Sequence, residues 1–309
     1  MVLNNIVVVG SCMIDLVSYA PRLPFPGETI HGSKFVTTYG GKGANQCVAA
    51  SKLGGKTALV ARVGDDIWGK KYIENLKKEN VSTLFVKEMP QVSTGIAQII
   101  VSDSGENQIV IVAGANDELT RQDVENAKTT IKEAAVVVLQ LETSVDIAIK
   151  TMELCKGISI LNGAPALGNY NPKLLKLPTI FCVNESEASI FAGIPVNSKR
   201  DAERAAFELL SKGCNSVLIT LGAQGALYVS KREKKCYHFN SPSVKCIDST
   251  GAGDAFIGAL AYLLANKKDL LKSIEMSCII AADSVTRQGT QISFPDSDIL
   301  KTLEHLSRD

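Results

Sequence analysis

Short apolar runs alternate with longer segments in which apolar residues recur every three or four positions along most of this 309-residue chain. The short runs are rich in β-branched residues and predict strands at 6–9, 57–63, 136–139, 158–161, 179–183 and 216–220. The longer segments predict helices at 68–79, 119–133, 145–155, 185–192, 202–212, 252–265 and 270–287. Strands separated by helical lengths imply right-handed crossovers. We therefore expect an α/β fold with a mostly parallel sheet covered by helices on both faces.

Two regions interrupt this alternation. Residues 19–39 contain three prolines and then loosely alternating apolar positions, which indicates extended, edge-like structure outside the main sheet. Residues 94–101 and 107–112 are strand-like runs joined by a turn-rich stretch, as in a β-hairpin. Together these segments predict a small separate sheet built from insertions. A second copy of the chain is the simplest candidate to cover the apolar face of such a sheet.

Residues 248–254 read Asp-Ser-Thr-Gly-Ala-Gly-Asp and stand directly before an apolar helical pattern. A helix start offers free backbone N–H groups and the positive end of the helix dipole. The small residues Gly251, Ala252 and Gly253 leave room for an anion there. Asp254 falls in the first turn, where a carboxylate can take a proton from an attacking hydroxyl. The structural alternative is a glycine-rich turn that starts a tightly packed helix capped by Asp254.

A second glycine-rich turn, at residues 40–45, precedes a helical run through Leu53. It lacks the Ser or Thr that follows the lysine of a Walker loop, and it also lacks the spacing of the dinucleotide fingerprint. Lys42 is equally consistent with a solvated turn residue. Asn45 is consistent either with a hydrogen bond to a polyol ligand or with a helix cap.

Polar residues gather where the carboxyl ends of the predicted strands should meet, which is the edge at which ligands bind in open α/β sheets. Asp15 is expected just past the first strand, and the others are Glu142, Asn162, Asn184, Glu187, Thr220 and Gly222. For each one alone, a helix cap or a turn is the favoured explanation. Their common position favours a binding site.

Composition narrows the class of protein. A net charge of +1 without long runs of one sign gives no reason to expect binding to nucleic acid or to an anionic membrane. The eight cysteines form no Cys-x-x-Cys pair and indicate reduced thiols, and three widely spaced histidines argue against a zinc site or a histidine-based triad. No apolar run approaches the roughly 20 residues of a membrane span, and no signal segment is recognised. We expect a cytoplasmic protein, with the nucleus as a second compartment if the source is eukaryotic.

Six pieces of the chain resemble the ribokinase family of sugar and nucleoside kinases, in order and spacing, over nearly the full length. They are Gly10-Ser11 with Asp15, residues 40–46, 114–116, 184–187, 220–222 and 248–254. The resemblance implies one three-layer α/β/α domain over residues 1–309, with a small β-sheet lid formed by insertions at about 17–39 and 94–113. It also implies transfer of the γ-phosphoryl group of ATP to the 5-hydroxyl of D-ribose, with Asp254 as general base and the turn 251–253 as anion hole.

Further roles follow from the resemblance alone. The sugar site would comprise Met13, Ile14, Asp15, Gly41, Lys42, Gly43, Ala44, Asn45, Glu142 and Asp254. ATP would be held by Asn184, Thr220, Leu221, Gly222, Ala223, Gln224, Gly225, Gly253 and Cys278. Glu187 would reach Mg²⁺ through water, and K⁺ beside the anion hole would be bound by Asp248, Thr250, Ser284, Arg287, Gly289 and Ser293. The lid would also join two chains in a homodimer.

Two positions depart from the family pattern. Met13 stands where bacterial members that phosphorylate ribose commonly have Asn, which replaces a polar sugar contact by an apolar one. Ser249 stands where Thr is usual and keeps the hydroxyl group. Two alternatives stay open. A fructokinase or nucleoside kinase would share Asp254 and the anion hole, whereas a non-catalytic sugar-binding regulator would have no chemical need for that base.

Overall fold

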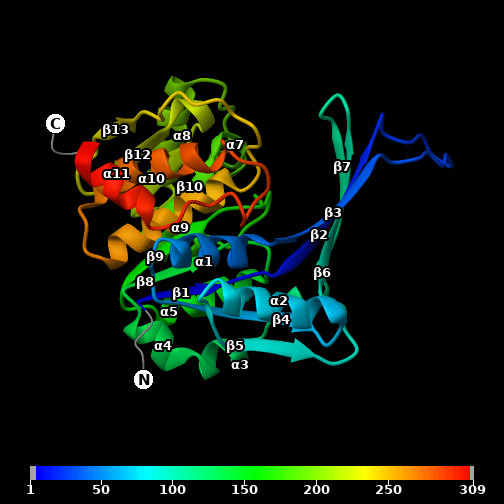
Figure 1. The fold of residues 1–309 in the computed structure, drawn as a ribbon. Coiled ribbons are helices and arrows are strands. Elements are labelled where there is room, and N and C mark those ends of the chain that lie inside the picture. Colours follow the sequence, from blue (N-terminus) through cyan, green and yellow to red (C-terminus); the bar gives the residue numbers. More distant parts are fainter. Residues whose placement is uncertain (1–4, 307–309) are drawn as a thin grey trace.

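A computed structural model describes residues 5–306, so the first four and last three residues of the predicted span 1–309 lie outside the described residues. The chain forms a nine-stranded sheet and a separate four-stranded sheet (Figure 1). The order of the large sheet is β13-β12-β11-β10-β9-β8-β1-β4-β5. Its strands are β1 Ile6–Val9, β4 Thr57–Gly64, β5 Ser82–Met89, β8 Val136–Leu139, β9 Ile158–Asn162, β10 Ile180–Asn184, β11 Ser216–Thr220, β12 Ala226–Ser230 and β13 Cys236–Phe239.

The large sheet is mostly parallel, as the alternation of strands and helices predicts. Every neighbouring pair from β5 across to β11 is parallel, and only β12 and β13 run antiparallel to their neighbours. All six predicted strands are present, with ends within about one residue of the prediction. The carboxyl ends of the parallel strands therefore meet at one edge, as a ligand site requires.

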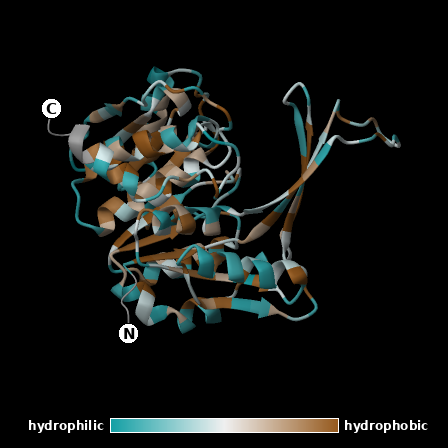
Figure 2. Cartoon of the chain, viewed as in Figure 1, coloured by the Kyte–Doolittle hydropathy of each residue, from teal (hydrophilic) through white to brown (hydrophobic). Residues whose placement is uncertain are grey.

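Helices cover both faces of this sheet and make three layers (Figures 1 and 2). One face carries α1 Lys42–Lys52, α2 Ile67–Lys78, α9 Ala252–Ala265 and α10 Leu270–Ser284. The other carries α3 Arg121–Asn126, α4 Lys128–Glu133, α5 Val145–Leu154, α6 Lys173–Lys176, α7 Glu185–Ala192 and α8 Lys199–Ser211. Successive residues of β1 enter opposite cores because strand side chains alternate, and each fully buried Val or Ile contributes about 1.5–3 kcal/mol. The three-layer α/β/α prediction is confirmed.

The small sheet, which we call the lid, has the order β3-β2-β6-β7 and stands apart from the rest of the molecule (Figure 1). Its strands are β2 Met13–Ala20, β3 Lys34–Gly40, β6 Gly95–Ser102 and β7 Asn107–Val112. The separate sheet, the edge position of β3 and the hairpin of β6 and β7 were predicted, whereas β2, which pairs with β3 and β6 and lies inside the lid, was not predicted as a strand. Asp15 is within β2 rather than just past β1, because the chain enters the lid directly after residues 10–12.

Other differences lie at weakly patterned segments. The helix predicted at 119–133 is two short helices, α3 and α4, that meet at Ala127. The last predicted helix ends at Ser284 rather than at 287. Besides β2, the elements that were not predicted are β5, β13, α6, the outer helix α11 Asp298–Leu306 and two 3₁₀ turns, η1 Gly114–Asn116 and η2 Gly222–Gln224. Strands β5 and β13 are sheet edges with mixed polarity, so their sequences lack a strong strand signal.

None of the helices between residues 5 and 306 has the length and apolar character needed to cross a bilayer. All eight cysteines lie in this part of the chain as free thiols, five of them buried.

Candidate active site

Asp254 lies in the first turn of α9, and its side chain is nearly buried, with 8% of its surface exposed. Gly251 precedes the helix with φ of 80°, a left-handed conformation that glycine adopts without strain. The helix therefore starts abruptly after residue 251 and points its amino end at the carboxyl edge of the sheet. The predicted position of Asp254 in the first turn is confirmed.

Two side-chain amides from α1 hold the carboxylate of Asp254. Asn45 Nδ2 donates to Oδ2 and Gln46 Nε2 donates to Oδ1, each at 2.9 Å. Gln46 also donates to Asn162 Oδ1 at 3.1 Å, and its own carbonyl accepts from Gln140 Nε2 at 2.6 Å. Asn45 thus contacts the predicted base and is not a helix cap. Gln46 belongs to the motif at residues 40–46 but was not predicted as a site residue. The only indication of its role in the sequence was its position next to Asn45.

A second layer fixes Asn45 in turn. Gln291 Nε2 donates to Asn45 Oδ1 at 3.0 Å and to the hydroxyl of Tyr72 at 3.2 Å, while Tyr72 donates to the carbonyl of Gly40. Asn75 Nδ2 donates to Gln291 Oε1 at 2.9 Å. These residues come from α2 and from the loop after α10, far apart in sequence. No local pattern could have identified them.

Burial raises the pKa of Asp254, and the nearby Lys42 ammonium and the amides of Gln46 and Asn45 oppose that rise without cancelling it. A carboxylate in this setting accepts a proton more readily than one in water. The position suits a general base.

Lys42, Asp15 and Glu142 surround the same space. Burial lowers the pKa of Lys42, but the carboxylates of Asp254, Glu142, Glu187 and Asp15 outweigh it, so the net shift is upward and the lysine stays charged. The pKa of Asp15 is raised to about 7, mainly by burial and next by the negative charges of Glu142 and Asp254. The positive charge of Lys42 partly opposes this rise. Glu142 Oε2 accepts from Ser11 Oγ at 2.5 Å and from the backbone N–H of Lys42 at 2.8 Å. Lys42 is therefore part of a charged cluster and not a solvated turn residue.

The glycines of the cradle have different surroundings. A Cβ on Gly251 would lie 2.6 Å from Thr290 and 3.1 Å from Phe294, whereas a Cβ on Gly253 would have no atom within 4 Å. The N–H of Ala252 already donates to the carbonyl of Ser249 at 3.2 Å, so it is not free for an anion in this state. Gly251 shapes the turn, and Gly253 leaves open space beside it.

Two cavities meet at this turn and share Thr220, Ser249, Ala252 and Gly253. The smaller, about 200 Å³, contains Lys42, Asp254, Asn184 and Glu187. The larger, about 350 Å³, is mainly apolar and is lined by six predicted nucleotide residues, Thr220, Gly222, Ala223, Gly225, Gly253 and Cys278. It also includes the unpredicted residues Ser241, Pro242, Ser243, Val244, Cys246, Phe256, Ala281, Ala282 and Val285. Most of these follow β13 or lie on α10, where no polar motif marks them.

Asn184 and Glu187 also cap the start of α7. A capping role was the alternative to ligand binding for the polar residues at the strand ends. Asn184 Oδ1 accepts from the N–H of Glu187 at 2.8 Å, and Glu187 Oε2 accepts from the N–H of Asn184 at 2.9 Å. Burial raises the pKa of Glu187, which Asn184 and Lys42 partly offset. The pair is a capping box that borders the smaller cavity.

Some predicted residues present no side chain to either cavity. Ile14, Ala44 and Leu221 lie in the hydrophobic cores, so only their backbones are available to a ligand. Gln224 does not line the larger cavity. Gly41 and Gly43 pack against residues 10–13, where a Cβ would lie 2.5–2.8 Å from the nearest backbone atom. These two glycines bring α1 close to the start of the lid.

The residues predicted for K⁺ are brought together beside the cradle. Asp248 accepts from the N–H of Thr250 and from the N–H of Gly289, each at 2.9 Å. Arg287 Nη2 donates to the carbonyl of Ser293 at 2.8 Å, so this carbonyl already has a cationic partner. The hydroxyl of Ser284 donates to Ala281 within α10. The six predicted residues offer one carboxylate, that of Asp248, together with backbone carbonyls and the hydroxyls of Thr250, Ser284 and Ser293.

The chain is similar to characterised sugar kinases over nearly all of its length. Residues 3–297 match the family model described as pfkB family carbohydrate kinase. The chain is 47% identical to the ribokinase of Mus musculus over 94% of this chain and 91% of that protein, and 37% identical to the deoxyribokinase of Salmonella typhi over 94% and 95%. The solved structure of Arabidopsis thaliana ribokinase complexed with ribose and ATP superposes with a TM-score of 0.89 at 30% identity, covering 97% of this chain and 98% of that one.

The family model spans the whole described sheet and both cavities, and the identities to curated relatives lie well above the level at which only the fold is shared. The chain therefore belongs to the pfkB family of carbohydrate kinases, as its resemblance to the ribokinase family predicted, and is a kinase.

Proposed function

We propose that this kinase transfers the γ-phosphoryl group of ATP to the 5-hydroxyl of D-ribose, giving D-ribose 5-phosphate and ADP. The observation that carries the proposal is the position of Asp254, which lines the charged cavity at the amino end of α9, next to Ala252 and Gly253 where this cavity meets the apolar one. The similarity to ribokinases, one of them complexed with ribose and ATP, supports the choice of substrates.

In the proposed reaction the 5-hydroxyl gives its proton to Asp254 while its oxygen bonds to the γ-phosphorus, and the bond from that phosphorus to the β,γ-bridging oxygen breaks. Asn45 and Gln46 keep the accepting oxygens aimed at the cavity. Lys42 and the first-turn N–H groups near Gly253 stabilise the negative charge on the transferring group. Positioning and electrostatics supply most of the acceleration in such transfers.

ATP fits the pair of cavities in one direction. The apolar cavity suits a flat base, with Cys278 and Phe256 in its wall, and the charged cavity suits the phosphates. Glu187 borders the charged cavity as a hard oxygen donor and fits Mg²⁺ held through water. When bound, Mg²⁺ neutralises phosphate charge. The residues themselves position the phosphates and exclude water.

K⁺ is the second proposed ion. The carboxylate of Asp248 and the carbonyls of Thr250, Ser284, Arg287, Gly289 and Ser293 are hard ligands of the kind K⁺ takes, and their place beside Gly251 would let a cation orient the cradle. Arg287 already donates to Ser293, so this carbonyl would have to be shared between the guanidinium and the ion.

A second substrate, 2-deoxy-D-ribose, is favoured by a specific residue. Met13 is buried at the start of β2, two residues before Asp15 and therefore on the same face of the lid. An apolar side chain there offers no partner to one sugar hydroxyl. A deoxyribokinase is among the relatives. Fructose and adenosine stay weaker candidates, and a purely sugar-binding role would leave the arrangement around Asp254 without use.

The product identifies the reaction directly. Incubation of D-ribose with ATP and Mg²⁺, followed by phosphorus and proton NMR, is expected to give a monoester on the 5-carbon together with one ADP per sugar. Asp254→Asn under the same conditions is the control. A phosphate on another carbon, or ADP without phosphorylated sugar, would contradict the proposal.

A further inference from the structure

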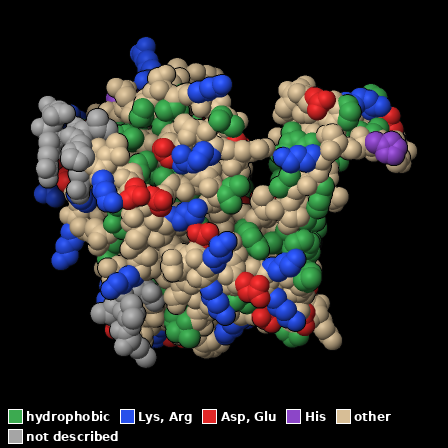
Figure 3. Space-filling view, viewed as in Figure 1, with side chains coloured by type: hydrophobic (Ala, Val, Ile, Leu, Met, Phe, Trp, Pro, Cys, Tyr) green, Lys and Arg blue, Asp and Glu red, His purple; other side chains and the backbone are tan. Residues whose placement is uncertain are grey.

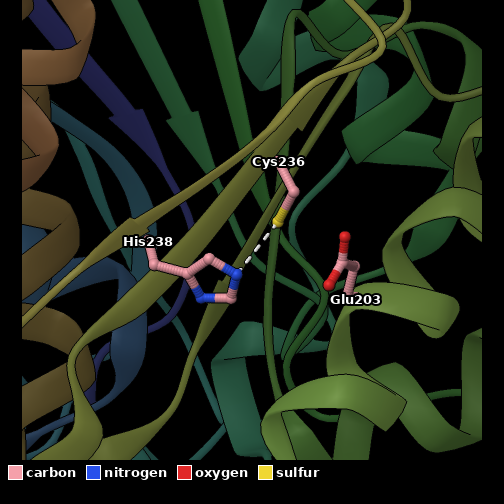
Figure 4. Close-up of side chains that lie close together, drawn as sticks. All are labelled: Glu203, Cys236 and His238. Atoms are coloured by element: carbon pink, nitrogen blue, oxygen red, sulfur yellow. Dashed lines mark hydrogen bonds between the residues drawn. The ribbon is translucent and has the colours of Figure 1, made fainter.

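Glu203, Cys236 and His238 bring one oxygen, one sulfur and one nitrogen ligand atom together (Figure 4), and none of the three lines either cavity of the candidate active site. All three atoms lie within 4.8 Å of one another. Cys236 and His238 come from the edge strand β13, and Glu203 comes from α8, which covers the adjacent face of the sheet. Histidines that are widely spaced in sequence argued against a zinc site, but a mixed site needs only one of them.

The positions of the donors follow from strand geometry. Residues two apart on a strand point to the same face, so Cys236 and His238 are neighbours on the side that α8 covers, while Tyr237 points to the other side. Pairing of β13 with β12, Cys236 with Val229 and His238 with Leu227, fixes the backbone of both residues. The strand is at the sheet edge, so the site is open to solvent.

We propose that this cluster binds Zn²⁺ or a similar borderline-soft divalent ion, with water as the fourth ligand. Thiolate and imidazole together select such ions over Mg²⁺ and K⁺. Bonds of roughly 2.0–2.3 Å at tetrahedral angles place neighbouring ligand atoms roughly 3.3–3.6 Å apart. Cys236 Sγ and His238 Nε2 are already 3.4 Å apart. Only Glu203 has to approach, through rotation of its long side chain.

Charge favours occupation. Glu203 places a carboxylate beside the thiol of Cys236 and the imidazole of His238. Within the part of the chain that the structure describes, no ion-pair partner is found for Glu203. A divalent ion replaces the thiol proton, one Zn–S bond forms and one proton leaves to solvent.

The test uses Co²⁺ as a coloured stand-in for Zn²⁺ on the full-length, chelator-treated protein. The expected result is a thiolate-to-cobalt charge-transfer band that saturates at one equivalent and is abolished by one equivalent of Zn²⁺ but not by excess Mg²⁺. Cys236→Ser and His238→Ala should remove the band, and Glu203→Gln should weaken it. Cys155→Ser, which removes another half-buried thiol, should leave it unchanged.

Calorimetry with Zn²⁺ at about pH 8 gives a second readout. Titrations in two buffers of different ionisation enthalpy should report release of about one proton per Zn²⁺ in the wild type and in Cys155→Ser, and none in Cys236→Ser. His238 is exposed, so His238→Ala keeps the fold, which circular dichroism verifies. Absence of the cobalt band in the wild type, or its persistence in Cys236→Ser, would overturn the proposal.

Discussion

Asp254 is held by two amide donors, and each donor is held by further side chains, so the carboxylate has little freedom to turn away from the cavity. Burial leaves it more basic than a solvated aspartate. Asp15 is also largely buried but faces the carboxylates of Glu142 and Asp254 rather than amide donors, and burial together with these charges raises its pKa to about 7. At the scale of residues, the proposed reaction uses Asp254 for proton transfer and Asp15 for recognition of a sugar hydroxyl.

Replacing Asp254 by Asn should lower kcat by about 10² or more while leaving the sugar KM within a few-fold of the wild type, since general-base contributions are typically 10²–10⁴. Steady-state kinetics with D-ribose measures both constants. The isosteric amide keeps the packing, and ADP binding by calorimetry serves as the control for an intact fold. Turnover near the wild-type rate would remove Asp254 from the reaction.

Asp15 should make ribose binding depend on pH. The ionised carboxylate accepts a sugar hydroxyl, and its pKa is about 7, so ribose affinity should rise with pH up to about 7 and level off above it. Below that value the affinity should fall by up to roughly tenfold per pH unit. Calorimetric titration from about pH 5.5 to 8.5 measures this dependence. Glu142, Asp254 and Lys42 face the same space and broaden the transition.

The raised pKa of Asp15 also makes the free energy of unfolding depend on pH. Between about pH 4 and 7 the folded protein holds a proton on Asp15 that the unfolded chain has lost, so this group makes folding less favourable as pH rises through that range. The melting temperature of Asp15→Asn minus that of the wild type should therefore be larger at pH 8 than at pH 5. The ribose affinity of this variant should be weak and nearly independent of pH. A wild-type affinity that stays constant across this range would contradict both expectations.

At the scale of elements, a strong periodic pattern of apolar residues was sufficient to predict a strand or a helix from the sequence. The buried parallel strands, α5, α7 and α9 were predictable because their apolar periods are long and their boundaries carry glycine or capping residues. Strand β2 was missed because it begins inside the polar motif formed by Gly10, Ser11 and Asp15. Strand β13 was missed because Cys-Tyr-His-Phe has no clear alternation of apolar and polar residues. Asp254, Lys42 and Asn45 could be predicted from glycine-rich helix starts. Gln291 and Tyr72 could not, since only tertiary packing brings them to Asn45.

The start of α9 offers a paired test. Gly251→Ala places a methyl group 2.6 Å from Thr290 in a left-handed residue and should destabilise the fold by about 1–3 kcal/mol. Gly253→Ala meets no protein atom and should leave the melting temperature unchanged or slightly higher. Because Gly253 lines both cavities, its methyl group should displace the phosphates and lower kcat/KM by about 10².

If these roles are correct, melting temperature and loss of activity should separate the two variants in opposite ways. Gly251→Ala should be the less stable protein, and Gly253→Ala the one with a specific loss of activity at full stability. A Gly253→Ala enzyme that retains wild-type kcat/KM would show that no phosphate approaches this residue.

At the scale of the whole molecule, the lid projects from the body and carries apolar side chains along its length (Figure 3). Pairing in register places Ile109 and Ile111 on the face that bears Asp15, and Val110 and Val112 on the other face. Val110 is 64% exposed and Phe35, on the same outer face, is 62% exposed. We propose that the inner face closes over the sugar and that the outer face packs against the lid of a second chain.

Val110→Lys should therefore convert a dimer into a monomer, because a charge would be buried in the proposed interface. Ile109→Lys lies next to it on the inner face and should remain dimeric. Sedimentation velocity of both variants and the wild type at matched concentration measures this difference. A wild-type protein that sediments as a monomer, or a Val110→Lys protein that remains a dimer, would contradict the proposed interface.

The central claim, that this kinase acts on a pentose through the charged cluster around Asp254, is tested most directly by kcat/KM for D-ribose, 2-deoxyribose, arabinose, fructose and adenosine under identical ATP, Mg²⁺ and K⁺. D-Ribose should lead. 2-Deoxyribose should follow more closely than the roughly 10⁴-fold penalty that a fully polar site imposes on an analogue lacking one hydroxyl, because Met13 leaves one contact apolar. Fructose and adenosine should fall far behind. A series led by fructose or adenosine would contradict the proposed substrate and the assignment of Asp15, Lys42 and Glu142 to a ribose site.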